Sequence, residues 1–450
     1  MKKIYCYQGF MALAAGFVIS APVLGQTLSE AIEQTVRTNP DILTTTAERS
    51  AVAQEVRQAK GGYLPTVDVN AGWGYEEANN PSTRRAINPR NRGTVDMERT
   101  ELGIQARQMI FDGFGTPNDV RRTRAKLDAQ SHQVYATAEK VALDAAEAYF
   151  EVLRQQEMVG NARDNLALHE KTLDQIRIRS EGGVGRRSDA SQAEGRVALA
   201  RKNLMAEEAN LRDAEYHFQT VIGAVPDKVA PPDLPASALP KSLDEAIESA
   251  VGSHPQLKSA ESDIAEADAQ HDVAKAPFYP RVDAELSATY YSNLNGVYGY
   301  NNDYQAMLRM RYNLFRGGRD EANLKRTAHL KDEAKEIRNH TYRQVVESMR
   351  FSWNAYQTVG QQLQFFKEHL EATQVTYKAY QQQFNLGERT LLDLLDTANE
   401  LYAARSEKIK GEYDHLFAKS RVLAAMGALN STLQVKLPEE ATLNEPKLLF

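Results

Sequence analysis

The chain has 450 residues, a quarter of them charged, and a formal net charge of only −6. This balance offers neither a basic patch nor a polyanionic tail, so we do not expect nucleic acid as a partner. The single cysteine, Cys6, leaves no disulfide to form, and no run of 18 apolar residues occurs after the N-terminal segment. That pattern argues against helical membrane spans but leaves a β-barrel possible, because barrel strands are short and only alternately apolar.

The first element is an apolar stretch at the N-terminus. Lys2 and Lys3 precede a largely apolar run over residues 4–19, and small residues lie before Gln26. This order is typical of a cleaved secretory signal, which we place at residues 1–25. A short anchor helix is the alternative, but the run is short for a membrane span. We therefore expect the protein to leave the cytoplasm.

The rest of the chain consists of two related halves. Residues 28–40 recur at 243–255, and residues 110–113 recur at 314–317. Repeats fix architecture, so we expect one structural unit used twice. The predicted domains are a first repeat at residues 26–225, a proline-rich connector at 226–240, a second repeat at 241–430 and a C-terminal tail at 431–450.

Each half contains two predicted strands, in which apolar and polar residues alternate. They lie near residues 66–76, 100–111, 281–291 and 303–314. Such alternation suits a strand between lipid and an aqueous lumen, although a half-buried soluble sheet gives the same pattern. Four strands are too few to close a membrane barrel, which needs about eight. A barrel would therefore require several chains.

Long helices follow each strand pair. Apolar residues at alternating spacings of four and three form a heptad seam from Val141 to Ile176, and the same register recurs from Val345 to Tyr380. A seam of this length indicates coiled-coil packing, and about 65 helical residues reach roughly 95 Å. A soluble periplasmic coiled-coil adaptor is an alternative that explains the heptads, but it does not explain four lipid-facing strands.

Motifs for catalysis are missing from the sequence. It has no His-Glu-x-x-His or paired-cysteine spacing for a metal, and no Gly-x-Ser-x-Gly elbow. The glycine-rich residues 182–185 lie between two long helices rather than after a strand, which disfavours a phosphate-binding loop. We expect no enzyme, and no catalytic, cofactor-binding or metal-binding residues.

The signal, the duplicated strand-pair and helix units, and the motif at residues 386–396 (LGERTLLDLLD) together resemble the TolC family of outer membrane efflux proteins. The resemblance implies a mixed α and β fold. Three chains, each with four strands, would form a 12-stranded outer-membrane β-barrel continued by a long periplasmic α-helical coiled-coil barrel. It also implies that this homotrimer, set in outer-membrane lipid, docks through a periplasmic adaptor (membrane fusion) protein onto an inner-membrane transporter of the ABC or RND type.

In that family the periplasmic tip is an entrance that rests closed, narrowed by rings of aspartates. Asp393 and Asp396 match the ring positions. They are three residues apart and so share one face of a helix, and three chains would gather six carboxylates around one axis. Acidic rings favour cations in channels, whereas a solvated helix face is the ordinary alternative for two such residues.

The same resemblance implies that an arginine ties neighbouring helix pairs together at the tip. Arg389 matches that arginine, and Ser188 and Asp189 match its partners. Phe384 stands where the best-known member has a tyrosine, and since a phenyl ring has no hydroxyl we expect that link to be absent. One exposed ion pair is worth at most ~1 kcal/mol, so a gate would depend on three copies acting with helix packing.

The sequence therefore predicts the exit channel of a tripartite export system. The glycine pair Gly317 and Gly318 inclines the cargo prediction towards type I protein secretion. Multidrug or small-molecule efflux is the alternative, and a soluble adaptor is a distant third.

Overall fold

The computed structural model describes residues 25–85, 93–182, 186–226, 228–232, 234–235 and 238–443. The secretory signal expected at the N-terminus lies outside the described residues except for Gly25. Parts of the connector, of the first strand-to-strand loop and of the tail also lie outside them.

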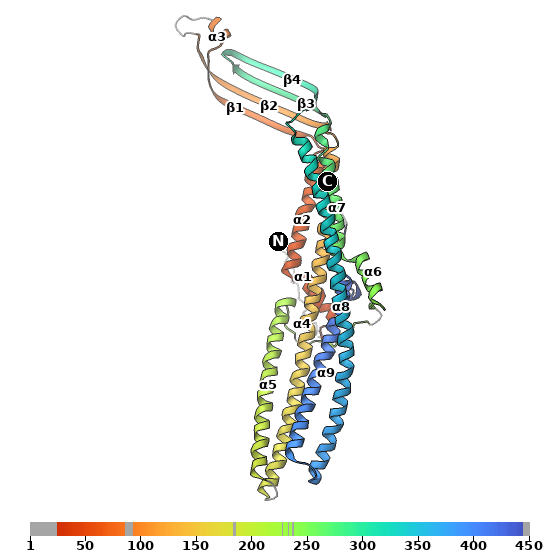
Figure 1. Cartoon of the computed structure of the whole chain (residues 1–450). Helices are drawn as coiled ribbons and strands as arrows, with labels where there is room; N and C mark the ends of the chain where they lie inside the picture. Colours follow the sequence, from red (N-terminus) through yellow and green to blue (C-terminus); the bar gives the residue numbers. More distant parts are fainter. Residues whose placement is uncertain are drawn as a thin grey trace, which may run out of the picture.

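The molecule is elongated, with a β-sheet at one end and long helices that run from it to the other end (Figure 1). The first half contains α1 (Leu28–Thr38), α2 (Pro40–Gly61), β1 (Thr66–Ala78), α3 (Pro81–Arg85), β2 (Val95–Phe111), α4 (Gly115–Glu181) and α5 (Arg187–Ile222). The second half contains α6 (Leu243–Ser253), α7 (Pro255–Val273), a 3-10 turn η2 (Ala276–Phe278), β3 (Arg281–Leu294), β4 (Val297–Arg311), α8 (Arg319–Leu386) and α9 (Leu391–Ala425). Two short elements, α10 (Leu429–Thr432) and η3 (Glu439–Ala441), follow. Apart from the short α3 and η2, the two halves repeat one order of elements, which confirms the duplication.

Capping residues at equivalent positions start the same helix in both halves. Asn39 caps α2 and His254 caps α7, each accepting a hydrogen bond from the backbone N–H two residues on. Pro40 and Pro255 follow at the first helical position, where a missing N–H costs nothing and the fixed φ suits a helix. The local sequence therefore ends one helix and starts the next between α1 and α2, and again between α6 and α7.

The four strands form one antiparallel sheet in the order β1-β2-β3-β4. One row of paired residues across it is apolar: Val69, Ile104, Ala288 and Tyr304. The neighbouring row, on the other face, is polar: Asp68, Gln105, Ser287 and Gln305. Because side chains alternate between faces along each strand, the sheet has one apolar and one polar face, as expected for a strand between lipid and a lumen.

The fourth strand differs from its predicted bounds, because it begins at Val297 instead of near residue 303 and ends at Arg311 instead of near residue 314. Its start follows from a tight turn at Asn295 and Gly296, which have φ values of 53° and 81° and let pairing with β3 begin at once. Its end follows from the partner strand, since Arg311 pairs with Arg281 and the preceding Pro280 has no N–H to donate. Strand pairing, rather than apolar alternation, therefore sets both ends.

The long helices have the predicted length and packing. α4 has 67 residues and α8 has 68, which at 1.5 Å per residue is about 100 Å. The α4–α5 and α8–α9 hairpins run away from the sheet side by side (Figure 1). Every predicted seam position is buried or half-buried: Val141, Ala145, Ala148, Val152, Gln155, Val159, Ala162, Leu166, His169, Leu173 and Ile176 in α4, and Val345, Met349, Ser352, Tyr356, Val359, Leu363, Phe366, Leu370, Thr373, Tyr377 and Tyr380 in α8. Among the described residues, no helix is long and apolar enough to cross a membrane.

The main core lies midway along the helices, around Tyr149 of α4. This side chain is fully buried, and its hydroxyl lies 2.8 Å from the carbonyl oxygen of Gln26 and 2.6 Å from that of Ala230. Burial raises the pKa of Tyr149 to about 12. The contact fixes both the start of the first repeat and the connector against α4.

A second buried polar contact holds the segment after α9. The carboxylate oxygens of Glu139 accept hydrogen bonds from the backbone N–H groups of Leu429 and Asn430, at 3.0 and 3.2 Å. Burial raises the pKa of this carboxyl to about 7. α4 therefore carries a titratable group in direct contact with the C-terminal segment.

Candidate functional site at the hairpin tips

The tip of the α8–α9 hairpin is a tight turn at the end of the molecule remote from the sheet (Figure 1). α8 ends at Leu386, and Gly387 follows with φ of +83°, which glycine adopts without steric cost. The N–H of Glu388 donates to the carbonyl oxygen of Gln383 at 2.9 Å. Two residues later Thr390 caps α9, so the motif singled out in the sequence builds this turn.

Asp393, one of the two predicted ring residues, also closes a capping box with Thr390. The Oδ2 atom of Asp393 accepts hydrogen bonds from the Thr390 hydroxyl at 2.8 Å and from the Thr390 N–H at 3.3 Å. In return, the Asp393 N–H donates to the Thr390 hydroxyl oxygen at 3.3 Å. The guanidinium of Arg389 lies 3.9 Å from the same oxygen. This carboxylate therefore helps to start α9 while it remains at the surface of the tip.

Among the residues that the structure describes, the contacts of Arg389, the predicted tying arginine, lie within its own hairpin. Its Nε donates to Gln383 at 2.9 Å, and its guanidinium lies 4.1 Å from the centre of the Tyr380 ring. Ser188 and Asp189, its predicted partners, bond to each other at 3.3 Å at the start of α5. In the described part of the chain, no hydrogen bond or ion pair joins Arg389 to either of them. A tie of the predicted kind is thus not formed within one chain.

Asp396, the second ring residue, does join the two hairpins. Its Oδ1 lies 2.6 Å from Nη2 of Arg196 in α5. Arg196 was not predicted from the sequence, although the duplication contains a signal for it. The first-half counterpart of Asp396 is Gln192, and Arg196 stands one helical turn further along α5.

Phe384 provides a different link from the one lost with the tyrosine hydroxyl. Its side chain is buried in a cluster that contains Ile176, Tyr377, Leu391, Leu394, Leu395, Ala398 and Leu401. The guanidinium of Arg179, from α4, lies 4.9 Å from the centre of the Phe384 ring. A cation over an aromatic face contributes about 0.5–1 kcal/mol at an exposed site, so α4 and α8 are held together here without a hydroxyl.

Residues 31–224 and 246–428 match the family model of the outer membrane efflux proteins. The chain belongs to this family. The outer membrane efflux protein BepC of Brucella suis biovar 1 is 24% identical over 421 residues, covering 93% of this chain and 89% of BepC. The outer membrane protein TolC of Vibrio cholerae is 23% identical over 439 residues, covering 96% of each chain.

Solved structures show the same fold. A crystal structure of CusC, described in terms of folding and transmembrane channel formation, has a TM-score of 0.76 and 16% identity to this chain, and the match covers 90% of this chain and 93% of CusC. The outer membrane efflux proteins are channel proteins of tripartite systems. The protein is therefore an outer-membrane efflux channel component with a long helical extension into the periplasm.

Proposed function

We propose that three copies of this chain assemble into one channel with a 12-stranded barrel. The support is that β1 and β4 are the two edges of the four-stranded sheet and pair with no further strand on their outer side among the described residues. An unpaired backbone group in lipid costs several kcal/mol, so these edges need partners. A β4 edge that pairs with β1 of the next chain supplies them, and three chains with four strands each give twelve strands, a number within the range in which membrane barrels close.

We also propose that the hairpin tips form a periplasmic gate, with Asp393 and Asp396 at the constriction. Arg389 would tie its hairpin to Ser188 and Asp189 of a neighbouring chain, since it does not reach them within its own chain. The intrachain contacts of the tip, in which Asp396 bonds α5 and Asp393 caps α9, would hold the two acidic residues in register. Release of these links on docking with the adaptor and the transporter would open the entrance.

Single-channel recording of the purified protein in planar bilayers tests both proposals. Arg389→Ala should raise the single-channel conductance, because one tie per chain is removed. Asp393→Ala combined with Asp396→Ala should weaken block by divalent or trivalent cations, because an acidic ring concentrates cations. Arg319→Ala, next to the sheet and remote from the tip, is the matched control. Wild-type conductance in Arg389→Ala would contradict the tie, and wild-type block in the double variant would contradict the ring.

For the cargo, type I protein secretion and small-molecule efflux are the two candidates. Gly317 and Gly318 have φ values of 63° and 78°, so they serve the turn from β4 into α8 and no longer favour secretion. Efflux is supported by the similarity to BepC, which is named as an outer membrane efflux protein. Deletion of the gene separates the two, since lost drug resistance with an unchanged secreted proteome indicates efflux and the reverse indicates secretion.

A further inference from the structure

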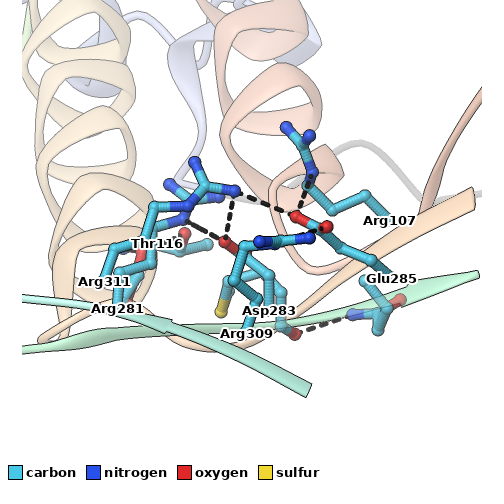
Figure 2. Close-up of polar contacts among 10 residues, drawn as sticks. Arg107, Thr116, Arg281, Asp283, Glu285, Arg309 and Arg311 are labelled. Carbon is cyan, nitrogen blue, oxygen red and sulfur yellow. Dashed lines mark hydrogen bonds and ion pairs between the residues drawn. The ribbon is translucent and has the colours of Figure 1, made fainter. Parts of the chain in front are cut away.

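Six charged side chains lie together at the end of the sheet that adjoins the helices (Figure 2). They come from three adjacent strands: Arg107 of β2, Arg281, Asp283 and Glu285 of β3, and Arg309 and Arg311 of β4. Strand pairing sets Arg107 opposite Glu285, Arg309 opposite Asp283, and Arg311 opposite Arg281. All six therefore share one face of the sheet, and we call them the basal arginine cluster.

The carboxylate of Asp283 is the buried part of this cluster. Its side chain has no exposed surface, and both of its oxygens lie 3.1 Å from Nε of Arg281. Nη2 of Arg311 lies 3.8 Å from Oδ2 of Asp283. A buried carboxylate needs such partners, because desolvation without them would be costly.

Glu285 is covered in the same way by three arginines. Its Oε2 accepts a hydrogen bond from Nε of Arg309 at 2.8 Å, and its Oε1 accepts one from Nη2 of Arg311 at 2.9 Å. Nε of Arg107 lies 3.4 Å from Oε1. The Glu285 side chain is only 10% exposed, so the arginines separate it from solvent.

Solvent at this site therefore meets guanidinium groups rather than carboxylates. The four arginine side chains are between 41% and 53% exposed, and they outnumber the carboxylates of the cluster by two. Asp68 of β1 lies diagonal to Arg107 on the same face and offsets part of this surplus. Guanidinium groups bind carboxylates and phosphates with paired hydrogen bonds, and these four present donors on one surface.

The cluster lies on the polar face of the sheet, in line with Asp68, Gln105, Ser287 and Gln305. In the proposed barrel this face lines the water-filled lumen. Further along the same face the charge reverses, because the single guanidinium of Arg99 contacts two carboxylates, those of Glu76 and Glu101. The basic charge is thus confined to one level of the lumen, next to the helices.

The duplication shows that the sheet does not need this cluster to form. Arg107 and Arg311 occupy equivalent positions in the two halves, but Arg281 and Arg309 correspond to Thr66 and Gln105. The first half therefore builds the same strand pair with neutral residues at two of the three arginine positions of the second half. The second half thus adds two arginines but only one carboxylate, since Glu285 corresponds to Asn70, so one added positive charge has no added carboxylate to balance it.

We propose that the basal arginine cluster is a binding site for multivalent anions, that is, for solutes or cargo segments that carry several carboxylates or phosphates. The site rests on the proposed trimeric channel, in which three copies would surround the lumen at one level. This basic site would attract anions, whereas the acidic tip would attract cations. An anionic group would be attracted at the base of the barrel after it has passed an entrance that favours cations.

Block of single-channel current by inorganic tripolyphosphate, added on the side of the bilayer that the barrel faces, tests the site. The wild-type channel should be blocked, and Arg309→Gln should weaken the block at least about tenfold, because Coulomb attraction from one guanidinium per chain is lost. Glu285 keeps Arg107 and Arg311 in this variant, so we expect folding to be preserved. Arg281→Thr with Arg309→Gln, which restores the first-half residues, should weaken it further, and Glu285→Gln should strengthen it.

Arg99→Gln is the matched control, since it also removes one arginine from the lumenal face but lies away from the cluster. Equal weakening in Arg99→Gln and Arg309→Gln would overturn the site and leave a general effect of lumenal charge. Unblocked current in the wild type would overturn it while leaving the channel intact. Absence of any conductance would refute the trimeric channel and the site with it.

Discussion

Glu139→Gln should abolish a pH dependence in how firmly the segment after α9 is held against α4. The Glu139 side chain is buried, and it accepts hydrogen bonds from the N–H groups of Leu429 and Asn430. Burial raises its pKa from 4.5 to about 7, against the opposing effect of those two hydrogen bonds. Tyr135, whose pKa burial raises to about 12, stays neutral over the same range.

The sign of the effect follows from proton binding. When the segment opens, the Glu139 carboxyl returns towards its ordinary pKa of 4.5. Between pH 4.5 and about 7 the closed state binds more protons than the open state, so the free energy of opening falls as the pH rises. The stabilisation is complete below pH 4.5 and is lost as the pH passes 7. The difference between the two pKa values corresponds to roughly 3 kcal/mol, or on the order of 100-fold in the opening equilibrium.

Hydrogen–deuterium exchange measures this opening directly. Protection of a peptide covering residues 426–435 against exchange should fall by up to about 100-fold between pH 5 and pH 8, after correction for the intrinsic exchange rate. In Glu139→Gln the protection should be flat, and at pH 8 it should exceed that of the wild type, since no charge is buried. Peptides from the middle of α9 serve as the internal reference. Flat protection in the wild type, or an equal decline in the variant, would refute the reasoning.

Three further substitutions test contacts in the helical part of the molecule. Arg196→Ala removes the partner of Asp396 and should raise single-channel conductance, because one link between the two hairpins of each chain is lost. The heat stability of the trimer should not change, because a half-exposed ion pair is worth about 1 kcal/mol or less. Unchanged conductance would exclude the pair from the gate. Tyr149→Phe leaves the carbonyl oxygen of Ala230 without the tyrosine donor, while that of Gln26 keeps the N–H of Ala230. The free energy of unfolding should fall by about 1–3 kcal/mol in denaturant titration, whereas an unchanged midpoint would show that the hydroxyl contributes little. Thr390→Ala removes the cap of α9, worth about 1 kcal/mol, and should speed exchange of the Asp393 amide, which donates to the Thr390 hydroxyl oxygen, about fivefold; wild-type exchange there would contradict the cap.

Periodic features of this fold could be predicted from the sequence because each depends on a local repeat. The heptad positions specify which side of α4 and α8 is buried, even where a polar residue such as Ser352 or Thr373 occupies one. Alternation likewise specifies the two faces of each strand. The ends of β4 could not be predicted in this way, because they depend on Pro280 before the partner strand and on the turn at Asn295.

The contacts at the tips were less predictable, for a geometric reason. Arg196 meets Asp396 only because the two hairpins have a particular rotation and axial offset, and a change of one turn, about 5.4 Å, would bring another residue to that place. The same applies to Arg179 over Phe384. The capping role of Asp393 was accessible, since threonine followed three residues later by an acidic residue is a known start of a helix.

The free strand edges have a consequence for the order of events in the cell. A newly exported chain carries the outer backbone groups of β1 and β4 unpaired, next to a sheet face rich in exposed aromatic and aliphatic side chains. Such an edge pairs with whatever strand it meets first, including a strand of an unrelated chain. Encounter of three copies must therefore compete with aggregation in the periplasm. The yield of finished protein should consequently depend on the rate at which chains arrive together, and not only on the stability of each one.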